Sequence, residues 1–217
     1  MRTEVSSPTI WKIKGKVFQL GPSPRRMRII DVTPDSFSDG GRLALSGRHT
    51  EPFRVGLDTV IQRGLALIRD GADIINIGGE STRPGSEPVS AKEQINRTEQ
   101  AIRLLAAETD RPISIDTTSA EVADRALTTG AAIVNDLSGT LFDPEISVAV
   151  RKHRAGICIG HIQRIPVNMR KNPLYENAVK RGCSFFEPNE GQTDSVGNRT
   201  ESHRHRSGNR IREDDCP

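Results

Sequence analysis

ADIINIGGESTRPG, residues 72–85, combines a nearly unbroken apolar run with a loop of glycine and polar residues. Four further runs have the same character: MRIIDVT at 27–33, PISIDTT at 112–118, AAIVNDL at 131–137 and AGICIGHI at 155–162. Strands buried on both faces of a parallel sheet are nearly continuous in apolar residues, and these runs fit that description. The sequence therefore predicts five strands of one parallel sheet.

Helical segments separate these runs. Ser90 and Glu93 have the spacing of a capping box, and Asp143 with Pro144 has the composition that opens a helix. A repeated order of strand and helix predicts a parallel sheet with helices outside it. Such a sheet is either open and doubly wound or closed into a barrel.

Polar residues gather where four of the strands end, and this favours the barrel. The clusters are Asp31 with Thr33, Gly78 to Arg83, Asp116 with Thr117, and Asn135 with Asp136. Barrel active sites are built at the carboxyl ends of several strands. We predict the α/β class and a (β/α)8 TIM-type barrel. Because eight units take about 250 residues, the barrel should be truncated here to about five βα units.

The chain before and after these units has a different pattern. WKIKGKVFQL, residues 11–20, alternates around Gly15 and predicts a β-hairpin. From Lys180 onward only six of 38 residues are apolar, which predicts disorder. The expected organisation is an N-terminal hairpin or lid at 1–26, a partial barrel at 27–179 and an aberrant, disordered tail at 180–217.

Composition excludes several classes of protein. The net charge of +3 is spread in mixed sign over 217 residues, which is typical of a solvated enzyme surface and argues against nucleic-acid binding. Cys158, Cys183 and Cys216 have no metal-binding spacing, and their arrangement fits a reducing compartment. No apolar run approaches the length that spans a membrane. We expect a cytoplasmic protein that binds neither nucleic acid nor membrane.

Two loops carry residues suited to anions and cations. VTPDSFSDGG at 32–41, preceded by Asp31, brings carboxylates to one strand end, where they can hold a hard cation. GGESTRPG at 78–85 offers glycine amides, hydroxyls and the guanidinium of Arg83, a set suited to phosphate. The alternatives are a plain surface loop for the first motif and a simple pairing of Glu80 with Arg83 for the second.

Asp116 ends one predicted strand and Asn135 ends the next. A carboxylate beside a carboxamide can bind a planar heterocycle that carries neighbouring donors and acceptors. Either residue could instead cap the helix that follows it.

The motifs together resemble the dihydropteroate synthase family of pterin-binding enzymes. VTPDSFSDGG, GGESTRPG, ISIDTT, VNDLSG and HIQRIPVNMRKNPLY occur in the family's order and at its spacing, from about Trp11 to Val179. The resemblance implies an enzyme that joins 6-hydroxymethyl-7,8-dihydropterin diphosphate to p-aminobenzoate and releases diphosphate. It further implies Mg2+ as the cofactor, sulfonamides as competitors of p-aminobenzoate, and a homodimer.

By position, the resemblance assigns Asp31 to the metal, Thr82 and Arg83 to the diphosphate, and Asp116 and Asn135 to the pterin. It requires no side-chain nucleophile or general base. Asp31 stands where the family has Asn, so it adds negative charge near an incoming diphosphate.

The family's later motifs, DPGxGFGK, SRK and RxHD, are missing from this chain. If TESHRHRSGNRIREDDCP, which ends at Pro217, is written in permitted codons and read one nucleotide later, it can encode PNRIVIDPGIGFGKTTA. We therefore predict a frameshift between about Val179 and Phe186. Two alternatives to the synthase remain open: a non-catalytic truncated fragment, and a barrel of the pterin-binding methyltransferase type.

Overall fold

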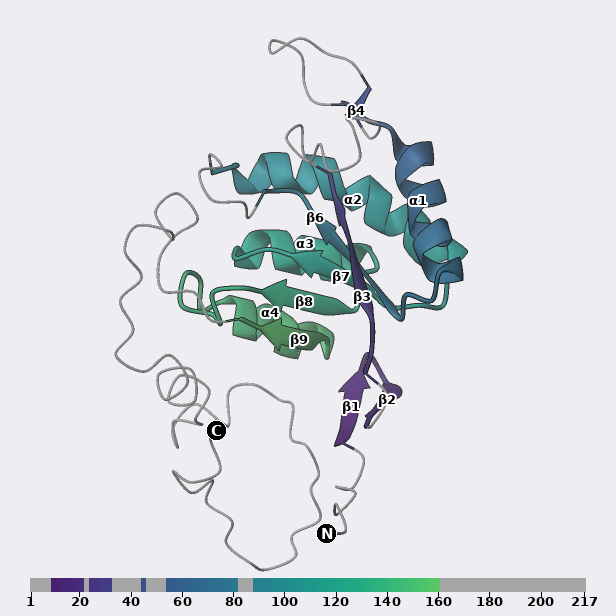
Figure 1. Ribbon diagram of the computed structural model, residues 1–217. Coiled ribbons are helices and arrows are strands. Elements are labelled where there is room, and N and C mark those ends of the chain that lie inside the picture. Colours follow the sequence, from purple (N-terminus) through teal and green to yellow (C-terminus); the bar gives the residue numbers. More distant parts are fainter. Residues whose placement is uncertain (1–8, 22–23, 33–43, 46–53, 82–87, 161–217) are drawn as a thin grey trace, which may run out of the picture.

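The computed structural model describes residues 9–21, 24–32, 44–45, 54–81 and 88–160. Its centre is a parallel sheet of five strands, shown in Figure 1. The strands are β3 (Met27–Asp31), β6 (Ile74–Gly78), β7 (Ile113–Asp116), β8 (Ile133–Asp136) and β9 (Gly156–Ile159). Each lies inside one of the five apolar runs, so the predicted strands are confirmed.

The order of the strands distinguishes a barrel wall from an open sheet. They are hydrogen-bonded in the order β3-β6-β7-β8-β9, each beside the next parallel strand along the chain. A doubly wound sheet reverses its order at a switch point, whereas a barrel adds strands in one direction. The described strands therefore form five consecutive positions of a (β/α) barrel, as predicted.

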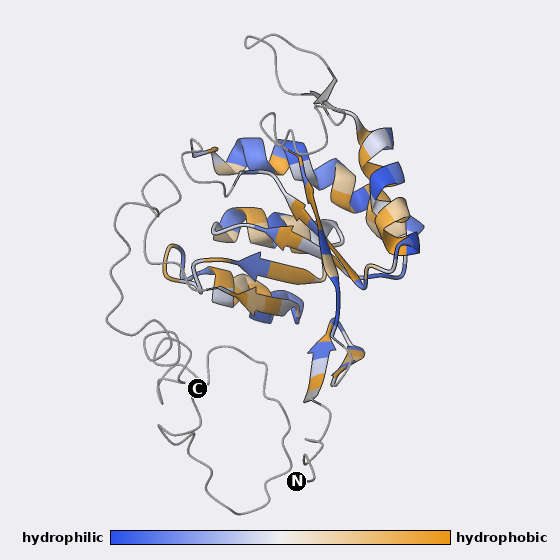
Figure 2. Ribbon diagram, in the orientation of Figure 1, coloured by the Kyte–Doolittle hydropathy of each residue, from blue (hydrophilic) through white to orange (hydrophobic). Residues whose placement is uncertain are grey.

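Within the described ranges, four helices cover the outer face of this sheet (Figure 1). They are α1 (Leu57–Arg69), α2 (Ala91–Glu108), α3 (Ala120–Thr129) and α4 (Ile146–His153). Their apolar sides pack on the strands in one core. In Figure 2 the orange of hydrophobic residues appears on both the strands and the helices that cover them. The core includes Ile75, Ile77, Ile102, Leu105 and Ile115, each at most 1% exposed.

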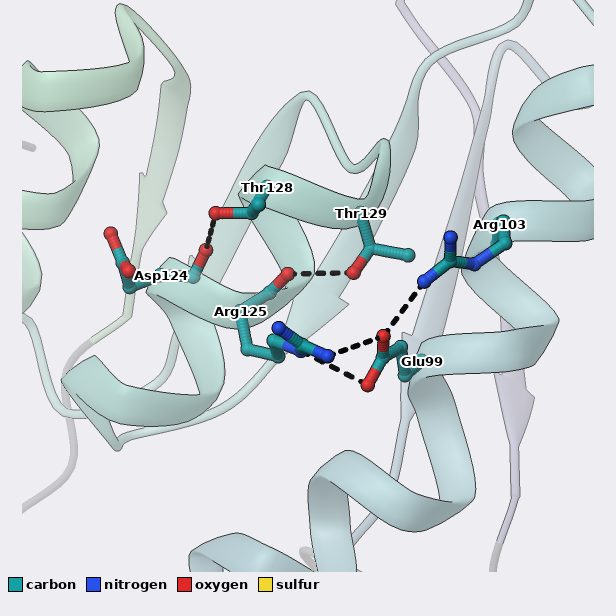
Figure 3. Close-up of polar contacts among 6 residues, drawn as sticks. All are labelled: Glu99, Arg103, Asp124, Arg125, Thr128 and Thr129. Atoms are coloured by element: carbon teal, nitrogen blue, oxygen red, sulfur yellow. Dashed lines mark hydrogen bonds and ion pairs between the residues drawn. The ribbon is translucent and has the colours of Figure 1, made fainter.

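Ion pairs join neighbouring helices at the surface (Figure 3). Glu99 on α2 accepts two hydrogen bonds from Arg125 on α3, at 3.0 and 2.8 Å, and one from Arg103 at 2.8 Å. Hydrogen bonding by Arg125 is the main cause that lowers the pKa of Glu99. Exposed pairs of this kind contribute at most about 1 kcal/mol, so the apolar core carries most of the packing energy.

Both predicted helix starts are found. Ser90 caps α2, and its hydroxyl accepts a bond from the Glu93 amide at 3.3 Å. Asp143 opens the turn that leads into α4, which begins at Ile146: its Oδ1 accepts the Glu145 amide at 3.2 Å, and its carbonyl accepts the Ile146 amide at 3.2 Å. Its Oδ2 also accepts the Ala120 amide at 2.7 Å, at the first residue of α3. Asp143 therefore serves the starts of two helices.

The predicted N-terminal hairpin is present. Strands β1 (Thr9–Ile13) and β2 (Lys16–Leu20) are antiparallel, and Lys14 and Gly15 form the turn with φ of 45° and 79°. Two positive φ values are typical of the tight turn that suits twisted strands. An unpredicted pair of two-residue strands, β4 (Ala44–Leu45) and β5 (Arg54–Val55), lies between β3 and α1 in the chain.

The hairpin lies at the amino ends of the barrel strands. Its residue Ile13 forms a small cluster with Ile74 and Ile133, which begin β6 and β8. The Lys14 amide donates to the Arg154 carbonyl at 2.8 Å, just before β9. The hairpin therefore does not cover the carboxyl ends of the strands, which lie at the opposite end of the barrel wall and can form a site. Among the helices of the described ranges, none is long and apolar enough to cross a membrane.

Candidate active site at the carboxyl ends of the strands

A row of residues crosses four neighbouring strands near their carboxyl ends. Strand pairing places Asp31 beside Gly78, Gly78 beside Asp116, and Asp116 beside Asn135. Residues at the same level of a parallel sheet face the same side, which here is the inner face of the barrel wall. The structure thus brings together three residues that the sequence predicted for the site: Asp31, Asp116 and Asn135.

Asp116 is the centre of this row. The side-chain amides of Asn76 and Asn135 both donate to its Oδ2, at 2.9 and 3.1 Å. Neither bond involves Oδ1 of Asp116. Burial raises the pKa of Asp116 above its ordinary value, as do the charges of Asp31 and Asp136, while the two amide bonds oppose the rise. The site therefore holds a carboxyl group that accepts protons more readily than a solvated one.

A capping role for Asp116 is not needed, because other side chains serve the start of α3. The Ser119 amide donates to Thr117 Oγ1 at 3.1 Å, and the Ala120 amide donates to Asp143. This leaves the side chain of Asp116 on the inner face, in contact with the two asparagines.

Gly78 keeps the space between two carboxylates open. A Cβ atom on Gly78 would lie 3.3 Å from Asp31 Oδ1 and 3.8 Å from the Cβ of Asp116. Any side chain here would stand between Asp31 and Asp116. The glycine therefore leaves room for a ligand to contact both strand ends.

A network of hydrogen bonds holds both ends of the loop that contains the predicted phosphate-binding motif, GGESTRPG. Glu80, before residues 82–87, accepts from the Val89 amide at 2.8 Å, after them, and from Gln94 Nε2 at 3.1 Å. Gln94 is 5% exposed, and its Oε1 accepts from Thr117 Oγ1 at 3.3 Å. Thr82 and Arg83 lie outside the described residues, as do Asp35 and Asp39 of the preceding motif. The network nevertheless holds the two points between which Thr82 and Arg83 run.

Helix α2 approaches the end of β6 closely. Arg97 donates to the Gly79 carbonyl at 3.0 Å, and a Cβ atom on Gly79 would lie only 2.9 Å from Thr98 Cγ2. Only a glycine permits this approach without displacement. Sequence reasoning missed Gln94 and Arg97, because on a helix they look like ordinary surface residues.

Asp136 organises the loop that follows β8. Its Oδ1 accepts from the amide and hydroxyl of Ser138, at 2.8 and 2.7 Å, and its Oδ2 accepts from the Thr140 amide at 2.6 Å. Asp136 is fully buried. Its role is to shape the loop beside Asn135, whose own side chain contacts Asp116.

Comparison with known proteins identifies the family. The family model described as pterin binding enzyme matches residues 27–202. The chain belongs to the pterin-binding enzyme family. The matched region starts at the first residue of β3 and includes every strand end described above; it continues past Val179, where the motif resemblance ends.

Relatives within this family are dihydropteroate synthases. The one from Synechocystis sp. is 43% identical over 170 residues, which cover 78% of this chain and 55% of the relative. Two crystal structures of dihydropteroate synthase are also similar, and each match covers 82% of this chain and 59% of the other. The Yersinia pestis enzyme, in a sulfonamide drug complex, has a TM-score of 0.68 at 34% identity. The Xanthomonas albilineans enzyme, with 4-aminobenzoic acid, has a TM-score of 0.67 at 33% identity. The chain therefore spans little more than half the length of these relatives.

Proposed function

We propose that this pterin-binding protein is a dihydropteroate synthase. It would condense 6-hydroxymethyl-7,8-dihydropterin diphosphate with p-aminobenzoate to give 7,8-dihydropteroate and diphosphate. The observation that carries the proposal is the row of Asp31, Gly78, Asp116 and Asn135 at the carboxyl ends of four strands. The similar synthases with bound 4-aminobenzoic acid and sulfonamide support the choice of the second substrate.

Asp116 and Asn135 would bind the pterin. Both amide donors go to Oδ2 of Asp116, so its Oδ1 is available to accept one N–H of the heterocycle. Asn135 donates through Nδ2, which leaves its Oδ1 as a second acceptor beside the first. A planar ring with two neighbouring donors fits this pair of oxygens.

Thr82 and Arg83 would bind the diphosphate. An arginine can donate two parallel bonds to phosphate oxygens, and a threonine hydroxyl adds a third donor. Glu80 and Val89 fix the ends of this segment, which limits where Thr82 and Arg83 can reach. The diphosphate would then lie next to the strand end that carries Asp31.

Asp31 fits a role as a ligand of Mg2+. The described part of the chain contains no group of three or more acidic, histidine or cysteine side chains that could enclose a metal. Mg2+ is commonly held through one or two carboxylates, with phosphate oxygens and water as its other ligands, so one carboxylate is sufficient. When bound, Mg2+ would neutralise charge on the departing diphosphate.

The reaction needs no nucleophile or base from the chain. The bond between the pterin methylene carbon and the diphosphate oxygen breaks, and its electron pair leaves with the diphosphate. The amine of p-aminobenzoate supplies the electron pair of the new C–N bond and then loses a proton. The contribution of the chain is to hold the pterin through Asp116 and Asn135 and the leaving anion through Arg83.

Two further properties belong to this proposal. The partners would be the two small substrates and, by family resemblance, a second copy of the chain. We also propose a cytoplasmic location, which the arrangement of the cysteines supports.

A second candidate is a pterin-binding protein without synthase activity, because Asp116 and Asn135, which are joined at the strand ends, would bind the pterin without taking part in a chemical step. Two measurements on the same sample separate the candidates: calorimetric titration with pterin diphosphate and Mg2+, and a turnover assay with p-aminobenzoate. Binding with turnover supports the synthase. Binding without turnover supports the non-catalytic protein, and the absence of binding contradicts both.

A further inference from the structure

Two buried polar atoms lie on the inner face of the barrel wall, one level below Asp116. Asn76 on β6 and Ser114 on β7 are each 0% exposed, and strand pairing places them side by side. Asn76 Oδ1 and Ser114 Oγ have no hydrogen-bond partner within the described part of the chain. Buried polar atoms are nearly always satisfied by protein or by ordered water, so this pair requires an explanation.

The chemistry of the two atoms fits one small ligand. Asn76 Nδ2 donates to Asp116, so Oδ1 of the same amide can only accept. The Ser114 hydroxyl can donate or accept. A water molecule offers two donors and two acceptor positions, and it can bridge such a pair inside a protein.

We propose that one ordered water molecule bridges Asn76 Oδ1 and Ser114 Oγ, and that through it Ser114 positions Asp116. The water fixes the orientation of the Asn76 amide, which then presents Nδ2 to Asp116 Oδ2. Asn76 and Asn135 together hold that oxygen from two strands and leave Oδ1 for the ligand. Asn76 and Ser114 are positioning residues, because both are fully buried beneath the strand ends. The consequence for pterin binding rests on the proposed function, whereas the water site does not.

The first test needs no substrate. In the full chain, water-to-amide cross-relaxation measured by NMR should give a signal at the Asn76 side chain. The variant Ser114→Ala should lose it and should shift the side-chain amide resonances of Asn135. Ser114→Thr keeps the hydroxyl and should restore both. A missing water signal in the wild-type chain overturns the water site, and an unshifted Asn135 amide in Ser114→Ala overturns the positioning role.

The second test measures binding. Ser114→Ala should weaken the affinity for pterin diphosphate roughly three- to tenfold, the loss expected for one hydrogen bond, and Ser114→Thr should recover it. Ser147→Ala, whose hydroxyl bonds the Pro144 carbonyl before α4, is the matched control and should bind as the wild type does. Equal affinity in Ser114→Ala and Ser147→Ala contradicts the proposal. If the wild-type chain binds no pterin, the proposed function fails, and the NMR test still decides the inference. Circular dichroism establishes that each variant is folded.

Discussion

The side-chain amide of Asn135 donates to Oδ2 of Asp116 at 3.1 Å, and so joins the carboxyl ends of β7 and β8. Asn135→Ala removes this donor and one acceptor oxygen of the proposed pterin site. We expect a loss of affinity for pterin diphosphate of about tenfold, the value of one to two hydrogen bonds, measured by calorimetry. Asn96→Ala, on the exposed side of α2, is the control. Equal affinity in both variants would show that Asn135 does not contact the pterin.

The raised pKa of Asp116 predicts how stability depends on pH. At pH values between the ordinary pKa of 3.8 and the raised pKa of folded Asp116, the folded chain binds a proton at this carboxyl group that the unfolded chain releases. The contribution of Asp116 to stability therefore falls as pH rises through this window, and it stays low above it. Asp116→Asn removes this dependence.

Denaturant unfolding of the wild type and Asp116→Asn across pH 3 to 8, about the span in which carboxyl groups titrate, measures the effect. Surface carboxylates such as Asp73 and Glu99 have lowered pKa values and change stability in the opposite direction, but they are common to both proteins. The difference in free energy of unfolding should move in favour of Asp116→Asn as pH rises. A difference that does not vary with pH contradicts the prediction.

Asp31 places a negative charge beside the proposed position of the diphosphate. We expect Asp31→Asn to bind pterin diphosphate more tightly, because an amide oxygen can still ligate Mg2+ while the repulsion is removed. Titration calorimetry with Mg2+ present measures the change, and Asp110→Asn, at an exposed position, controls for net charge. Unchanged or weaker binding in Asp31→Asn would count against this reading of the strand end.

The hairpin packs tightly on β9 at Gly156. A Cβ atom here would lie 2.6 Å from Trp11 Cζ2 and 3.1 Å from Ile13 Cδ1. Gly156→Ala should therefore destabilise the fold by about 1–3 kcal/mol, the usual cost of overpacking, as measured by thermal unfolding. Gly21→Ala is the matched control, since nothing lies within 4 Å of its added Cβ. The same melting temperature in both variants would show that the hairpin does not rest on β9 in solution.

The sequence of the tail makes a prediction about the coding DNA. We expect the nucleotides for Thr200 to Pro217, read one position later, to encode the string PNRIVIDPGIGFGKTTA. Sequencing the DNA from the codon of Asn172 onward and translating all frames tests this directly. If no offset frame encodes this string, the tail is an authentic part of the protein and the frameshift hypothesis is wrong.

The strands could be predicted from the sequence because a strand buried on both faces needs a continuous apolar run. The central site residues could be predicted because each is a polar residue at the end of such a run. Asn76 escaped notice because it lies within such a run, and only the strand register shows that it faces Asp116. The sequence shows only half of the role of Asp143: its neighbour Pro144 indicates the local helix start, which the Glu145 amide confirms, whereas its second partner, the Ala120 amide, is distant in sequence. The strands β4 and β5 are two residues long and carry no detectable period.

The hydrogen bond between the Lys14 amide and the Arg154 carbonyl has a consequence for the order in which parts of the chain fold. The ribosome synthesises the hairpin before the barrel strands. The Arg154 carbonyl, which accepts the hydrogen bond from the hairpin, is made only when the chain has reached the start of β9. Until then the apolar side of the hairpin can contact Ile74 and Ile133 but not β9. Contacts so distant in sequence form late, since a long loop must close first. We therefore expect the docking of the hairpin to be completed in one of the last steps of folding, and nascent chains that stop before Arg154 to leave the side of the hairpin that faces β9 exposed to chaperones and proteases.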